Sequence, residues 1–267
     1  MIFNIVFLIL VFAGTLYGVF HGEDLGKIVH IVKTVDPLWL IPGVICVVIF
    51  IWGESIIIFY MMHTLGIKLK KWTCFLFSSV GFFFSCITPS ATGGQPAQIY
   101  YMKKEKISIP VSTVILMIVT ITYKLVLVVI GIGIAIFGRG FLHKYLEGIL
   151  PVFYLGLMLN IFCVTFMTIL VFHPLFAKAI LVKGMKLLER FHLIRKKEGR
   201  LKKLEASMDT YRNTAAYLKN NPLVIVKVIG ITFIQRMALF AVTWFVYQAF
   251  GLHGTGFWDI LFLQAVI

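Results

Sequence analysis

The stretch that decides the fold is WTCFLFSSVGFFFSCITPSATGGQPAQ, residues 72–98, in which an apolar run passes into helix-breaking residues. Residues 72–87 carry no charge and are apolar enough to lie in lipid, whereas Pro89 and the Gly93–Gly94 pair should interrupt a helix. Irregular backbone at membrane depth is tolerated only where it is buried in protein or lines a cavity. The stretch therefore predicts a broken third membrane element, which we expect to enter the bilayer from the cytoplasmic side and return to it.

The rest of the chain is also too apolar for a soluble protein. Of its 267 residues, 60% are hydrophobic and 13% are charged, and the mean hydropathy is +0.96. A soluble domain cannot bury that much apolar surface behind a polar exterior. The formal net charge of +14 is explained by basic cytoplasmic loops that meet anionic lipid headgroups, so we expect no nucleic-acid partner.

Further apolar runs on both sides of the break give the number of crossings. A helix needs roughly 20 apolar residues to cross the hydrocarbon core. The runs cover residues 2–20, 38–62, 111–137, 149–172, 223–250 and 257–267, of which the last is too short to cross. We expect an all-α, polytopic helical membrane protein, with residues 1–267 forming a single transmembrane domain that is truncated at its C-terminal end.

Residues 173–221 form the main hydrophilic insertion. They carry twelve Lys and Arg residues against four acids, which predicts a cytoplasmic location. Apolar residues at spacings of three and four, such as Met208, Tyr211, Ala215 and Leu218, predict an amphipathic helical hairpin. Two roles remain open for the hairpin: packing beneath the bundle, or lying directly on the lipid surface.

The polar residues of the break are candidate lipid contacts. The start of the helix that follows offers free N–H groups and a partial positive charge, which favour a phosphate. Pro96 suits the first turn of that helix, and Thr92 or Gln95 could cap it. We predict a cavity for a lipid phosphate, whereas the alternative is an ordinary loop between two spans. The candidate substrate-binding residues here are Thr88, Ser90, Thr92, Gly93, Gly94, Gln95, Pro96 and Gln98.

Three charged residues lie deep within the predicted spans. Lys124 and Arg236 are near the middle of theirs, and Glu54 lies two-thirds along the second span. Such charges face the protein interior or water and find partners. Glu54 is a possible charge partner for Lys124 or Arg236, and the two basic residues are also candidates to attract an anionic headgroup. Asn160 and Gln235 are expected to form hydrogen bonds between helices.

The sequence contains no pattern typical of enzyme chemistry. Paired carboxylates, a nucleophilic triad, a nucleotide-binding loop and metal-ligand spacing are all missing from it. We therefore predict no catalytic residue, no metal and no cofactor.

The sequence TPSATGGQPAQIYY, residues 88–101, follows a short apolar helix and precedes a basic one. In this setting it resembles the flippase-like membrane domain of lysylphosphatidylglycerol synthases, whose stand-alone members are multi-span proteins of similar size. The resemblance covers essentially the whole chain, and its motif positions are Gly93, Gly94, Gln95 and Pro96. Many members have Glu where Gln95 stands and Arg where Gln98 stands, so a salt bridge at this site is not expected here.

The resemblance implies a multi-pass plasma-membrane protein, bacterial or archaeal, that translocates a polar or anionic phospholipid such as phosphatidylglycerol or its lysyl derivative. In full-length synthases this domain is associated with outward flipping of the modified lipid, and so with resistance to cationic antimicrobial peptides. Two alternatives remain. The chain is either the membrane part of a phosphatidylglycerol lysyltransferase, or a non-transporting subunit that scaffolds a membrane enzyme partner. A homo-oligomer is compatible with each.

Overall fold

The computed structural model describes residues 14, 17, 33–190 and 200–266, and this part of the chain consists of helices and their connections, without strands. Within these residues, four helices are long and apolar enough to cross a membrane, which confirms the predicted all-α polytopic membrane fold. The predicted first span, residues 2–20, lies outside the described residues except for Gly14 and Tyr17. The four long helices are α3 (Pro37–Thr64), α6 (Ile109–Phe137), α8 (Leu150–Phe172) and α11 (Pro222–Ala249). The helical stretch that contains α8 begins earlier in the chain and covers Gly140–Phe172.

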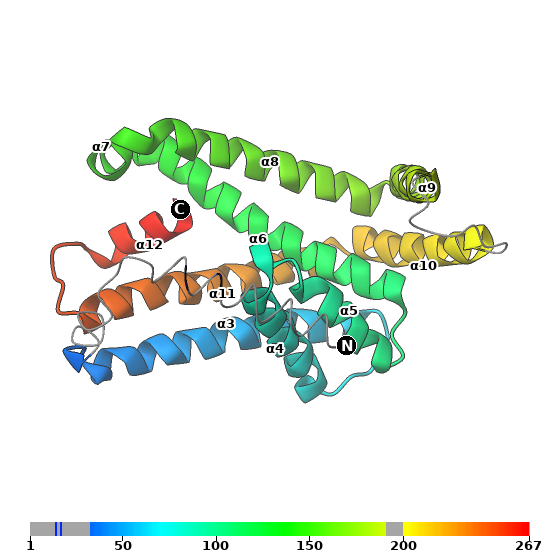
Figure 1. Cartoon of the computed structure of the whole chain (residues 1–267), viewed down its shortest axis with the longest axis horizontal. Helices are drawn as coiled ribbons and strands as arrows, with labels where there is room; N and C mark the ends of the chain where they lie inside the picture. Colours follow the sequence, from blue (N-terminus) through cyan, green and yellow to red (C-terminus); the bar gives the residue numbers. More distant parts are fainter. Residues whose placement is uncertain (1–13, 15–16, 18–32, 191–199, 267) are drawn as a thin grey trace.

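Helices α3 and α11 form a tightly packed antiparallel pair along one side of the bundle (Figure 1). The Nε2 of Gln235 on α11 donates a hydrogen bond of 2.9 Å to the backbone oxygen of Phe50 on α3. Gly53 makes room for that side chain, because a Cβ at Gly53 would lie 2.9 Å from Gln235 Cγ. At one end of the pair, the backbone N–H of Asp36 donates to Ala249 O at 2.9 Å. Gln235 thus forms the helix–helix hydrogen bond expected from the sequence.

Helix α6 lies in the centre of the bundle, and α8 lies along its outer edge (Figure 1). Thr122 on α6 and Thr232 on α11 are joined by a buried hydrogen bond of 3.2 Å between their hydroxyl oxygens. Only Phe153 and Val171 of α8 are buried, and its other side chains are exposed or partly exposed, as expected of a helix that faces lipid.

The broken third element consists of two short helices joined by a tight connection. Helix α4 (Lys71–Ile87) is followed by the 3-10 turn η1 (Pro89–Ala91) and by α5 (Gly94–Lys104), and α4 and α5 pack against each other. At about 1.5 Å per residue, neither α4 nor α5 spans the roughly 30 Å hydrocarbon core. Lys71 and Lys104 stand at the two free ends of this hairpin. Its geometry supports the re-entrant arrangement.

The hydrophilic insertion folds into α9 (Pro174–Arg190) and α10 (Arg200–Asn220), with residues 191–199 between them outside the described part of the chain. The predicted apolar face of α10 is buried against α6, α8 and α11. The hydroxyl of Tyr211 donates to Leu170 O at 3.1 Å. These contacts show that α10 packs onto the bundle. The residues of its buried face are Met208, Tyr211, Ala215 and Leu218.

At the opposite end of the bundle, two short helices cover the ends of the long ones. They are α7 (Arg139–Leu146), which leads through η2 (Glu147–Ile149) into α8, and α12 (Phe257–Val266), which packs on α11 and α6. The Tyr145 hydroxyl donates to Asp259 Oδ2 at 3.0 Å and so joins α7 to α12. Aromatic rings gather at this end, where Trp244 lies 5.6 Å from Trp39 and 5.1 Å from Phe257 between ring centroids.

Candidate functional site

The connection between α4 and α5 is held by the side chain of Thr88. Its hydroxyl donates to Phe84 O at 2.6 Å and accepts a hydrogen bond of 2.9 Å from the N–H of Gly93. Ala91, within the connection, has a positive φ of 55°. Thr88 and Gly93 therefore stabilise the turn itself. Of Ser90, only the backbone is described, within η1.

Helix α5 begins without a side-chain cap. Gly93 is the N-cap residue and forms no side-chain cap hydrogen bond, so the expectation that Thr92 or Gln95 caps the helix is wrong. The hydroxyl of Thr92 donates back to Pro89 O at 2.9 Å, and Gln95 Nε2 donates to the hydroxyl of Thr120 on α6 at 2.7 Å. The first N–H groups of α5 have no acceptor within the helix itself. This helix start therefore keeps donors available for an anion.

Small residues allow α4 and α5 to approach closely. A Cβ at Gly94 would lie 2.6 Å from the backbone oxygen of Gly81 and would also collide with the Ser85 hydroxyl. A Cβ at Gly81 would in turn overlap the amide group of Gln98. Gly81 and Ser85 are four residues apart on α4, the spacing that places two small residues on one helix face. The absence of a side chain at positions 81 and 94 is thus a packing requirement.

A cavity of about 460 Å³ opens between this hairpin and the neighbouring long helices. Its size is within the usual range for small-molecule sites, and α3, α4, α5, α6 and α11 all contribute to its wall. Six of the candidate residues meet there, four from the break and its following helix and two from distant spans. They are Glu54, Thr92, Gly94, Gln95, Gln98 and Arg236.

The acid in the cavity is paired with an amide instead of a base. Glu54 is 9% exposed, and its Oε1 accepts a hydrogen bond of 2.6 Å from Nε2 of Gln98 on α5. Among the described residues, neither Lys124 nor Arg236 forms an ion pair with Glu54 within 4.0 Å. The Glu54–Gln98 bond joins α3 to the α4–α5 hairpin across the cavity wall.

The base in the cavity lacks a hydrogen-bond partner for one buried atom. The guanidinium of Arg236 lies over the ring of Tyr123, 3.4 Å from the ring centroid, and 5.0 Å from that of Phe50. Within the described part of the chain, Arg236 Nε is the only buried side-chain nitrogen or oxygen without a hydrogen-bond partner. Leaving a buried donor unpaired is costly, particularly on a charged group. Because Arg236 also lines the cavity, its guanidinium is a group that would stabilise a ligand oxygen there.

Lys124 is not part of this cavity. Its Nζ lies 3.3 Å from Asn160 Oδ1 on α8, in a helix–helix contact. Pro96 stands in the first turn of α5, as expected, but outside the lining. The cavity therefore contains one basic and one acidic side chain, and the spare positive charge expected from Lys124 together with Arg236 is not present in it.

Several lining residues were not singled out by the sequence analysis. The ring of Tyr123 supports Arg236, and the hydroxyl of Thr120 binds Gln95. The Gly81–Ser85 spacing was a usable signal for close helix packing, whereas Tyr123 and Thr120 occur in an otherwise apolar span without a local pattern that marks them.

As for metals, no group of three or more His, Cys, Asp or Glu residues able to hold an ion occurs among the described residues.

Comparison with known proteins gives a match to one protein family. The family model described as the lysylphosphatidylglycerol synthase TM region matches residues 2–266. Neither the curated proteins nor the solved structures gave a match. The match covers nearly all of the chain, including α3 to α12 and the broken hairpin, and the chain therefore belongs to the lysylphosphatidylglycerol synthase TM region family.

Proposed function

We propose that the chain is a membrane lipid translocase that receives the headgroup of a polar or anionic phospholipid in the cavity beside the α4–α5 hairpin. The observation that carries the proposal is Arg236, which lines the cavity and whose buried Nε has no hydrogen-bond partner among the described residues. A phosphodiester oxygen would satisfy this donor. Charge-assisted hydrogen bonds of this kind are worth about 1.5–3 kcal/mol.

The start of α5 supports the same ligand chemistry. Gly94 lines the cavity in the first turn of α5, where helix geometry leaves the N–H groups without acceptors inside the helix. A helix N-terminus carries a partial positive charge that favours a phosphate. Arg236 and this helix start would therefore bind the phosphate together.

Glu54 gives the cavity a position for a positive charge. Gln98 donates to one carboxylate oxygen of Glu54, and no second donor to this side chain is found among the described residues. A headgroup that carries an ammonium group beside its phosphate matches one acid and one base. The lysyl derivative of phosphatidylglycerol has both groups, which is why we propose it as a substrate alongside phosphatidylglycerol itself.

The proposal is tested by leaflet-resolved lipid labelling in proteoliposomes. The purified chain is reconstituted with labelled phosphatidylglycerol, and the rate at which lipid becomes accessible to an external quencher is measured. Arg236→Leu is compared with Lys124→Leu, a matched change of a basic residue deep in another span. Arg236→Leu should slow movement about tenfold or more, whereas Lys124→Leu should retain most of the rate. A wild-type rate in correctly folded Arg236→Leu would refute the role of the cavity.

The alternatives give different results in the same preparation. Transfer of a lysyl group to phosphatidylglycerol by the purified chain alone would identify an enzyme. Activity that depends on an added membrane enzyme and tolerates substitution of Gly93 and Gly94 would identify a scaffold. Movement of lipid by the chain alone, lost on Arg236→Leu, supports the translocase.

A further inference from the structure

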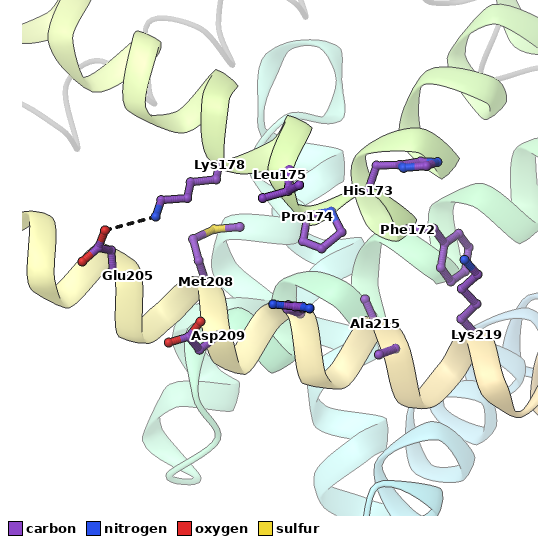
Figure 2. A pocket seen from close by; sticks show the side chains of 12 residues that line it. Phe172, His173, Pro174, Leu175, Lys178, Glu205, Met208, Asp209, Ala215 and Lys219 are labelled. Carbon is purple, nitrogen blue, oxygen red and sulfur yellow. Dashed lines mark hydrogen bonds and ion pairs between the residues drawn. The ribbon is translucent and has the colours of Figure 1, made fainter.

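A second cavity, separate from the one around Arg236, lies where α8 ends and the α9–α10 hairpin begins. Its volume is about 600 Å³, and Figure 2 shows its lining side chains between α10 and the junction of α8 with α9. The Lys178–Glu205 pair stands at one end of the view, and Phe172 and Lys219 stand at the other. The cavity around Arg236 shares no lining residue with it.

One stripe of α10 supplies the polar side of this second cavity. Its members follow at spacings of four, three, four and three residues, which places them on one helix face. The stripe is adjacent to the buried face of α10, so packing of that face against the bundle fixes the direction in which the stripe points. The residues are Glu205, Asp209, Arg212, Ala216 and Lys219.

The charges in this cavity leave an excess of positive charge. Lys178 and Glu205 neutralise each other in an ion pair of 3.1 Å, which joins α9 to α10. Arg212 and Lys219 remain against the single acid Asp209, and neither forms an ion pair or side-chain hydrogen bond with any described residue. His173 also lines the cavity. The polar side therefore matches an anion.

The other side of the cavity is apolar and continues to the lipid-facing surface. Phe172 is the last residue of the membrane-spanning helix α8, and Leu175 follows it at the start of α9. Leu175 is 83% exposed and its neighbour Phe176 is 44% exposed, although both are large apolar residues. Such residues at the end of a span belong at the boundary between headgroups and acyl chains. A ligand here meets charge on one side and hydrocarbon on the other.

We infer that this second cavity is a binding site for an anionic phospholipid of the cytoplasmic leaflet. The phosphate lies against Arg212 and Lys219, and an acyl chain runs along Phe172 and Leu175. A soluble anion would use only the polar half of the lining. The positive excess and the apolar half together select a lipid, and a zwitterionic lipid gains less because its own cation opposes the basic groups.

Site-resolved photocrosslinking tests this inference. The full chain is reconstituted in phosphatidylcholine with a phosphatidylglycerol that carries a diazirine near its phosphate, and crosslinked peptides are mapped by mass spectrometry. Crosslinks should fall within residues 172–178 and 205–219. The double variant Arg212→Gln/Lys219→Gln should reduce them on the order of tenfold or more. The matched control Lys68→Gln/Lys103→Gln removes two exposed lysines outside this cavity and should not change them.

Three results would overturn the inference. They are unchanged crosslinking in the α10 double variant, equal competition by unlabelled phosphatidylcholine and phosphatidylglycerol, and competition by free glycerol 3-phosphate as strong as by the lipid. Because Arg212 and Lys219 are exposed, the double variant should fold, which size-exclusion elution of the wild-type and variant chains verifies. Arg236→Leu should keep the α10 crosslinks, so failure of the translocase proposal and failure of this site are distinguishable.

Discussion

Replacing Gly94 with alanine tests whether the close approach of α4 and α5 shapes the first cavity. The added Cβ would lie 2.6 Å from the Gly81 backbone oxygen and would also collide with the Ser85 hydroxyl. Because one of these obstacles is backbone, a rotamer change cannot relieve it, and α5 must move away from α4. Overpacking of this kind costs about 1–3 kcal/mol.

Gly133→Ala on α6 is the matched control for this change. A Cβ at Gly133 would meet nothing within 4 Å, and the same substitution inside a helix normally stabilises by about 0.5–1 kcal/mol. Thermal unfolding in detergent should therefore place Gly94→Ala several degrees below the wild-type chain and Gly133→Ala at or slightly above it. The rate of lipid movement should fall in Gly94→Ala alone, because Gly94 lines the cavity. A Gly94→Ala chain as stable as Gly133→Ala would refute the packing argument.

Three further substitutions test other contacts. Glu54→Gln can still accept the hydrogen bond from Gln98 but removes the negative charge. In a competition assay, the preference for a lysyl lipid over phosphatidylglycerol should therefore fall about tenfold. An unchanged preference would contradict a role for that charge. Gln235→Leu removes the bond to Phe50 O and should lower the free energy of unfolding by about 0.6–1.7 kcal/mol in thermal melts, and no loss would show that the bond is dispensable. Burial raises the pKa of Tyr211 above its ordinary value of about 10, so the stability that the neutral phenol contributes is present below that value and is lost as the pH rises above it. Tyr211→Phe should make the alkaline decline in melting temperature shallower, and an identical decline would contradict this assignment.

The sequence predicted those parts of the fold that depend on local signals. Run length and polarity located the long helices, and Pro89 with Gly93 and Gly94 located the break between α4 and α5. The apolar spacing on α10 identified the face that is buried, because a helix has one periodicity whatever it packs against. Each of these signals lies within one element.

The parts that were not predicted depend on how separate helices meet. Glu54 was named as a possible charge partner for a base, but the α4–α5 hairpin brings Gln98 within 2.6 Å of it from 44 positions along the chain. Lys124 lies next to Tyr123 in the sequence, yet it contacts Asn160 on α8 while Tyr123 faces Arg236. Neighbouring residues on a helix point about 100° apart, so the crossing of α6 with α8 and α11 decides which of them reaches the cavity.

The close packing of α3 with α11 bears on how a headgroup would enter the first cavity under the proposed function. These two helices are joined at one end by the backbone hydrogen bond from the N–H of Asp36 to Ala249 O and near their middle by Gln235, and they carry Glu54 and Arg236. The remaining walls of the cavity belong to α4, α5 and α6. For the proposed translocase we therefore expect entry on that side, where the 2.7 Å hydrogen bond between Gln95 and Thr120 joins α5 to α6 through an exposed amide.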